Sequence, residues 1–188
     1  MTFSWYDLNY QVVKTYSQPN PMDPTALFAD FFAFGDSVYW IRSVTDTPTG
    51  ITDISLYTAS VSNVSPARLA GSISPTMTIV DVNARSILLL DNSKLYRVPL
   101  PLGLGNQPPE LLTALSNGSY FPPATEDTKG VYWLDTDGTL YICSNPLSCG
   151  TSKKVLANGQ SQFGFIYQDA SALYWATSTP SQVLRLAK

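Results

Sequence analysis

The chain has 188 residues, of which 44% are hydrophobic, 12% aromatic and 13% charged, with a net charge of −3 at pH 7. This length suits one domain with a substantial core, and the acidic balance excludes the basic surface typical of nucleic-acid binding. The absence of histidine removes the commonest metal ligand and the commonest general base near neutral pH. We therefore expect no metal, cofactor or nucleic-acid partner.

The N-terminal segment predicts one strand, YQVVKTYS, at residues 10–17. The opening MTFSWYDLNY has neither the basic start nor the apolar core of an export signal. No apolar run in the chain approaches the roughly 20 residues that span a bilayer. No membrane span is therefore expected.

Four similar units follow, each with a bulky strand core that recurs at intervals of about 42 to 49 residues. The cores are Val38–Trp40, Ile87–Leu89, Val131–Trp133 and Leu173–Trp175. A second strand follows each core, and a third apolar run closes the first three units. A further strand precedes an aspartate ahead of each core, at Asp36, Asp81, Asp127 and Asp169. These aspartates are predicted to form turns, although an acidic ring around a channel is the alternative.

Units of this length with four short strands are typical of β-propeller blades. The predicted fold is therefore all-β, a β-propeller of four four-stranded blades at approximately 24–71, 72–116, 117–159 and 160–188. The last unit lacks a fourth strand, and we expect residues 10–17 to supply it by pairing Val12–Lys14 with the C-terminal strand. The chain is then a four-bladed ring or half of an eight-bladed ring made by two chains, and a two-layer sandwich is the remaining alternative.

The string GVYWLDTDGTLYIC, then CG, VLANGQ and a new D-x-x-x-LYW, resembles a tandem repeat of predicted secreted proteins and lipoproteins of soil bacteria. The resemblance is best over residues 127–188 and looser over 30–115. It implies a β-propeller and a secreted or extracytoplasmic location, and it supplies no catalytic residue.

Two local motifs favour structural roles. Cys143 and Cys149 lack the C-x-x-C spacing of redox pairs and the further ligands of a zinc site, so they predict a small disulfide outside the cytosol. Asp135-Thr-Asp137-Gly138 resembles a fragment of a calcium loop, but a hairpin turn is favoured. Trp40, Trp133 and Trp175 are expected to pack between blades rather than to stack on sugars.

The favoured function is a non-catalytic extracellular binding module that uses loops at one end of the propeller to bind a protein or a glycan. The alternatives are a polysaccharide-acting enzyme with paired carboxylates and a structural half-propeller that forms a homodimer. The loops expected to bind are those after the second strand of each blade and those between blades. The candidate ligand-binding residues are Arg42, Asp91, Lys94, Tyr120, Phe121, Asp135 and Asp137.

Overall fold

The structure is a computed structural model of the chain, and it describes most of its residues. The described ranges are 2–7, 12–17, 27–45, 52–60, 67–70, 73–101, 108–116, 123–160, 165–178 and 180–188. Within them the protein is built almost entirely from antiparallel strands, which confirms the predicted all-β class.

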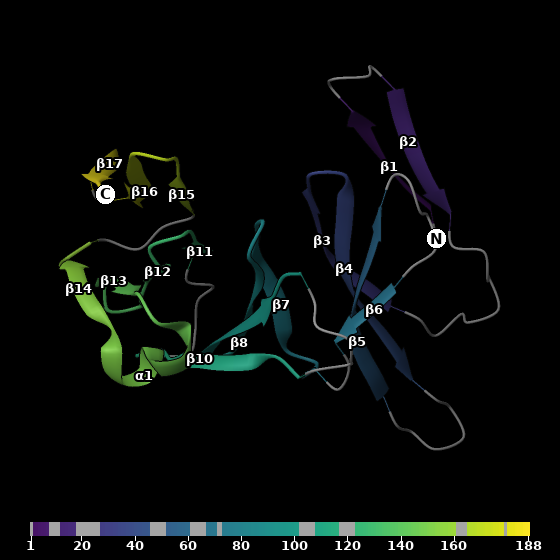
Figure 1. The fold of residues 1–188 in the computed structure, drawn as a ribbon, viewed down its shortest axis with the longest axis horizontal. Coiled ribbons are helices and arrows are strands. Elements are labelled where there is room, and N and C mark those ends of the chain that lie inside the picture. The colour runs from purple at the N-terminus through teal and green to yellow at the C-terminus, as the bar shows by residue number, and fades with distance from the viewer. Residues whose placement is uncertain are drawn as a thin grey trace.

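Four sheets follow one another along the chain, each made from consecutive strands (Figure 1). The first sheet contains β3 (Leu27–Phe34), β4 (Ser37–Thr45), β5 (Thr52–Ser60) and β6 (Ala67–Ala70). The second contains β7 (Met77–Val82), β8 (Ser86–Asp91), β9 (Lys94–Pro99) and β10 (Glu110–Ala114). The third contains β11 (Ala124–Glu126), β12 (Val131–Leu134), β13 (Leu140–Cys143) and β14 (Lys154–Ala157). The fourth contains β15 (Ile166–Gln168), β16 (Ala172–Ser178) and β17 (Ser181–Ala187).

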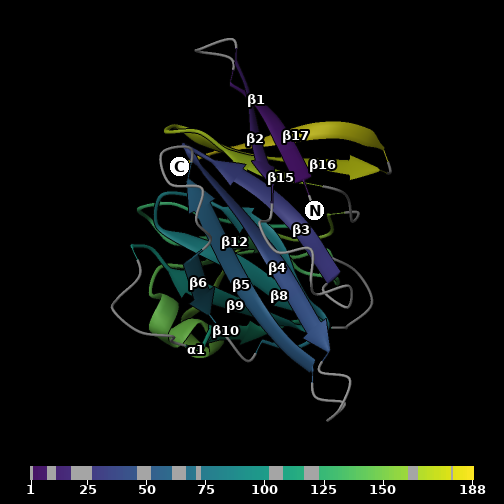
Figure 2. The same ribbon diagram turned by 90° about the vertical axis from the view of Figure 1, so that its right-hand side faces the viewer.

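Figure 1 shows the sheets along an arc, with the first and fourth sheets at its two ends, and Figure 2 shows the first sheet in front of the others. The first strands of successive sheets contact one another: β3 contacts β7, β7 contacts β11, and β11 contacts β15. Neighbouring first strands around a common axis are what stacked propeller blades require. The described sheets are therefore adjacent through their first strands, and the contacts between them do not close a ring.

The N-terminal strand does not make the pairing predicted for it. In the structure β2 (Val12–Ser17) pairs with β1 (Thr2–Asp7), and the neighbour of β17 among the described strands is β16. The two N-terminal strands are joined by a short connection, with Asp7 opposite Val12. A local hairpin closes a much shorter loop than a pairing between the two ends of the chain, so its entropic cost is lower.

Each sheet has two faces, which we name after the side chains of its second strand. The Trp face carries Trp40, Leu89, Trp133 or Trp175, and the Tyr face carries Tyr39, Leu88, Tyr132 or Tyr174. The Tyr face of each of the first three sheets packs against the Trp face of the next. Each of the three buried clusters contains side chains from these two faces.

The predicted packing role of the tryptophans is confirmed at two positions. Trp133 packs with Leu88, Leu90 and Leu95 of the preceding sheet, and Trp175 packs with Tyr132, all in buried clusters. Among the described residues, Trp40 packs within its own sheet: its cluster contains Val38 and Ala59, and its ring stacks on Tyr57 with centroids 5.9 Å apart.

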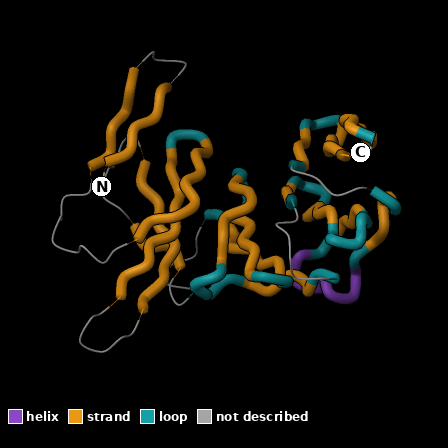
Figure 3. The backbone as a smooth tube through the Cα atoms, turned by 180° about the vertical axis from the view of Figure 1, so that it is seen from behind, coloured by secondary structure: helices purple, strands orange, loops and turns teal. Residues whose placement is uncertain are grey.

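The predicted disulfide is present between Cys143 and Cys149. A short helical segment connects the two cysteines, formed by the 3-10 turn Pro146–Ser148 and by α1 (Cys149–Ser152), which Figure 3 shows in purple. Both helical turns contact β10 of the second sheet, and both cysteines are buried in the cluster between the second and third sheets. The disulfide therefore fixes a loop that covers this interface.

The interface between the second and third sheets should contribute strongly to stability. Leu88 is fully buried on it, whereas Leu111 in β10 is 56% exposed. We expect Leu88→Ala to lower the free energy of unfolding by roughly 2–5 kcal/mol, because it removes buried methyl groups and leaves a cavity. The matched Leu111→Ala should change it by less than about 0.5 kcal/mol. Urea unfolding of both variants tests this, and equal losses would contradict it.

Candidate functional site

In three of the four units, an acidic or amide side chain forms the turn after the first strand. The role was predicted for four aspartates, and two of them have it. Asp127 accepts hydrogen bonds from the backbone N–H groups of Lys129 and Gly130, at 2.7 and 3.2 Å. Asp169 accepts from Ser171 and Ala172, at 2.7 and 2.8 Å. The turn-forming role is therefore confirmed at these two positions.

The second unit assigns that role to a different residue from the one predicted. Asn83 accepts from the backbone N–H groups of Arg85 and Ser86 at 2.9 and 3.1 Å, whereas Asp81 lies inside strand β7. An asparagine side-chain oxygen makes the same turn as an aspartate, so a search for aspartate alone selected the wrong residue. In the first unit, Asp36 lies in the tight turn between β3 and β4 and is exposed.

Two predicted ligand-binding aspartates are used to hold connections between sheets. Asp135 is fully buried, and its carboxylate accepts from the backbone N–H and the hydroxyl of Ser116 at 3.0 and 3.1 Å. Asp91, at the same position of the second sheet, accepts from Ser74 at 3.3 Å and from Thr76. These carboxylates tie each second strand to the chain segment that enters its sheet, which leaves them little capacity for a ligand.

The other predicted positions are dispersed. Arg42 occupies the position of Asp91 in the first sheet, and its guanidinium lies 5.9 Å from the ring centroid of Tyr57. Lys94 is exposed at the start of β9. Asp137 accepts from Thr139 N–H at 2.8 Å within the predicted hairpin turn, where Gly138 has φ +80°. Tyr120 and Phe121 lie outside the described residues.

A buried ion pair crosses between the second and third sheets. Both oxygens of Glu126 face Arg97, with Nε–Oε2 at 2.8 Å and Nη2–Oε1 at 2.9 Å, and Ser86 donates to Oε2 at 2.5 Å. The side chains of Glu126 and Arg97 are 2% and 14% exposed. Burial acts to raise the pKa of Glu126, but the hydrogen bonds from Arg97 and Ser86 outweigh it and hold the pKa below its ordinary value.

A second polar network runs beside it along the first strands. Thr125 donates to Asp81 at 3.0 Å, Gln168 donates to Thr125 at 3.1 Å, and Lys188 donates to Gln168 at 2.7 Å. Burial raises the pKa of Asp81, and the hydrogen bonds from Asn83 and Thr125 offset only part of that rise. These residues join the second, third and fourth sheets. They lie on the side of the molecule that carries the turns between the first and second strands of the sheets.

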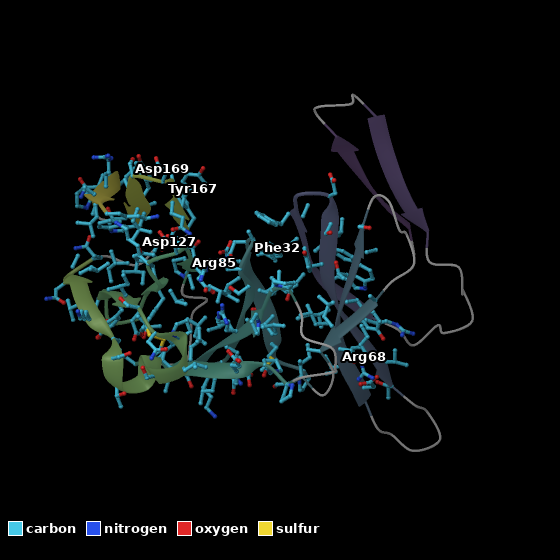
Figure 4. All side chains as sticks on the ribbon, in the orientation of Figure 1. Phe32, Arg68, Arg85, Asp127, Tyr167 and Asp169 are labelled. Atoms are coloured by element: carbon cyan, nitrogen blue, oxygen red, sulfur yellow. A yellow bond between two sulfur atoms is a disulfide. The ribbon has the colours of Figure 1, made fainter. Side chains whose placement is uncertain are left out.

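An open hollow of about 500 Å³ lies on this same side, between the turn after β3 in the first sheet and the turn after β7 in the second. Its walls combine aromatic, aliphatic and polar groups from these two neighbouring sheets. They are Phe34, Gly35, Asp36, Ser37, Tyr39, Asn83, Ala84, Leu100 and Pro101. Asp36 makes no hydrogen bond or ion pair with the residues that the structure describes, and Phe34 is 40% exposed. Figure 4 shows Phe32 and Arg85 in this part of the arc, with Asp127 and Asp169 farther along it.

Sequence reasoning placed the candidate site at the opposite end of the blades. The hollow depends on contacts between the turn after β3 and the segments around Asn83 and Pro101, which are distant in the sequence. The local sequence feature that could have indicated this site is Phe34, an aromatic residue directly before the turn in FAFGDS.

Comparison with models of protein families and with curated proteins finds no match to the chain. None of the described helices is long and apolar enough to cross a membrane. Among the described residues, no group of three or more acidic or cysteine side chains is placed to hold a metal ion.

The ion pair between Glu126 and Arg97 should make stability depend on pH. Because the folded-state pKa of Glu126 is lowered, its contribution is present above the ordinary value of about 4.3 and is lost as pH falls through the folded pKa. We expect Glu126→Gln to cost roughly 2–4 kcal/mol at pH 7, because it removes the closer and more buried of the two carboxylates that face a largely buried Arg97. Urea unfolding at pH 7 and at pH 3 should show this difference shrinking in acid.

Glu110→Gln is the matched control for this experiment. Glu110 also faces Arg97, but at 3.6 Å and with 38% of its side chain exposed. Its removal should cost less than about 1 kcal/mol. If the free energy of unfolding of Glu126→Gln falls below that of wild type by the same amount at pH 7 and at pH 3, the proposed stabilisation by the ionised Glu126 is contradicted.

Proposed function

We propose that this protein is a non-catalytic binding module of the β-propeller type, and that it takes a glycan or a peptide segment in the hollow between its first and second blades. The observation that carries this proposal is the hollow itself, because it joins exposed aromatic and polar groups from two blades. Loops on a rigid scaffold are the usual place for binding residues, and concave sites are the usual place for ligands.

The composition of the hollow favours a ligand with both apolar and polar faces. The ring of Phe34 and the side chains of Leu100 and Pro101 offer apolar contact, while Asp36 and Asn83 offer hydrogen-bonding groups. Sugars and extended peptides present this combination, since each has apolar patches between hydroxyl or amide groups. Asp36 retains its full capacity to accept hydrogen bonds from such a ligand.

The carboxylates around the hollow and along the neighbouring first strands favour binding over catalysis, because most of them are engaged by other side chains. Hydrolysis of a glycoside needs two carboxyl groups that are free to act as acid and as base or nucleophile. Glu126 is engaged by Arg97 and Ser86, Asp127 by Lys188 at 2.5 Å, and Asp81 by Asn83 and Thr125. Among the described residues that line the hollow, Asp36 supplies the one carboxylate. A polysaccharide-acting enzyme is therefore the less supported alternative.

An extracytoplasmic location is part of the same proposal. The disulfide between Cys143 and Cys149 is the supporting feature, because disulfides persist in oxidising compartments and are rare in the cytosol. The low share of charged residues is compatible with this environment.

Binding should depend on Phe34 and not on a neighbouring phenylalanine. Phe34 lines the hollow, whereas Phe31 lies on the same strand with the same 40% exposure and does not line it. In a screen of immobilised glycans and peptides, we expect wild type and Phe31→Ala to bind the same ligand. Phe34→Ala and Asp36→Ala should weaken binding at least tenfold, because they remove the apolar wall and the acceptor.

Two results would contradict this proposal. One is the absence of any ligand for the folded wild-type chain. The other is a ligand whose affinity is reduced by Phe31→Ala as much as by Phe34→Ala. Turnover of a bound glycan, detected as release of reducing ends, would favour the enzyme instead.

A further inference from the structure

The hollow between the first and second sheets carries an unbalanced negative charge. Asp36 lines it, and none of the other described residues around it is basic. Arg85 follows Ala84 of the wall in the sequence, but its guanidinium faces Glu126 of the third sheet, with Nε 3.5 Å from Oε1. A carboxylate that no cation of the wall offsets attracts a positively charged ligand.

The Asp36 carboxylate is available because of the short turn on which it lies. Phe34 pairs with Ser37, so the turn between β3 and β4 has only Gly35 and Asp36 between the paired residues, and Gly35 has φ +56°. A glycine at the first position is typical of such tight hairpin turns. The backbone pairing on either side closes this turn, and a side-chain cap is not needed.

The corresponding turns of the third and fourth sheets are longer and use their aspartates. These turns are residues 127–130 and 169–172, between the paired ends of their strands. In both, the aspartate at the first position accepts hydrogen bonds from backbone N–H groups inside the turn. Asp36 accepts none from the residues that the structure describes, so its carboxylate is left for a ligand.

The other groups of the hollow suit the rest of a basic side chain. Phe34 and Tyr39 line it and are 40% and 8% exposed. The face of an aromatic ring attracts an ammonium or guanidinium group. The stem of lysine or arginine is apolar and lies along apolar surface while its charged end meets an anion, and Leu100 and Pro101 supply such a surface.

We propose that the hollow binds a lysine or arginine side chain of a peptide segment, held by the Asp36 carboxylate and the ring of Phe34. This inference rests on the proposed function, because it specifies the ligand of the same site. It favours a basic peptide over a neutral glycan. A sugar hydroxyl donates a hydrogen bond to Asp36 but leaves its charge unbalanced, whereas an ammonium or guanidinium group supplies donors and the opposite charge together.

The experiment begins with an array of short peptides, capped at both ends so that only side chains carry charge. Peptides that bind wild type and lose binding to Phe34→Ala are ligands of the hollow, and we expect them to contain lysine or arginine. Each is then compared with an analogue in which norleucine replaces lysine or citrulline replaces arginine. The analogue should bind wild type about three- to tenfold more weakly, the combined effect of an exposed ion pair and an exposed cation–π contact.

Asp36→Asn tests whether charge, rather than hydrogen-bonding capacity, causes this preference. Asparagine keeps an acceptor oxygen, so Asp36→Asn should bind the basic peptide and its analogue about equally. Asp53→Asn is the control, since it changes the net charge by the same amount. Asp53 pairs with Val44 near the other end of β4, roughly 20 Å along the strand, which is beyond the Debye length of about 8 Å at physiological ionic strength. This variant should keep the wild-type preference.

The outcomes separate this inference from the proposed function. Peptides or glycans whose binding requires Phe34 but no basic side chain overturn the inference and leave the proposed function standing. A preference for the basic peptide that Asp36→Asn retains also overturns the inference alone. Basic peptides that bind Phe34→Ala as well as wild type, or the absence of any ligand, contradict both.

Discussion

The burial of the Tyr face of each of the first three sheets by the Trp face of the next sheet is the interaction on which this structure depends. A four-stranded sheet with bulky side chains on both faces must cover both of them, and a neighbouring sheet is the cover that the chain supplies. The second strands show the result, since Ile87, Leu88 and Leu89 are all fully buried although they point alternately to opposite faces. Each sheet is thus stabilised mainly by the sheets beside it, as in repeat proteins.

Apolar contact alone does not specify how two sheets are oriented, because hydrophobic burial is non-directional. The polar contacts between the sheets have direction. The paired hydrogen bonds from Arg97 to Glu126 fix the second sheet against the third, and the bond from Thr125 to Asp81 does so beside the first strands. Asp30 adds a similar tie between the first and second sheets by accepting from the backbone N–H of Ile79 at 3.2 Å. Directional bonds therefore fix the positions of sheets that apolar burial holds together.

The sequence allowed the strands, the four units, the disulfide and two of the turns to be predicted, because each depends on a local pattern. Trp133 is one example: it recurs at blade spacing and packs where its position in the unit predicts. The pairing of Val12–Lys14 with the C-terminal strand is not found among the described strands, where β2 pairs with β1. Asp135, a candidate ligand residue from the sequence, is buried and accepts a hydrogen bond from Ser116, which lies in the connection before its sheet and is not marked by any local pattern. The ion pair joins residues 29 positions apart, and no periodic pattern marks such contacts.

The fourth sheet differs from the third in the side chains of its Tyr face. Where the third sheet has Leu134, Leu140 and Ile142 on its Tyr face, the fourth has Ala176, Val183 and Arg185 at the same positions. A face to be buried by a full blade keeps large aliphatic side chains, whereas a face that meets water in the free chain tolerates smaller and charged ones. Aromatic surface nevertheless remains on the first strand, where Tyr167 replaces the buried Thr125. The fourth sheet thus combines smaller aliphatic side chains with exposed aromatic surface on this face.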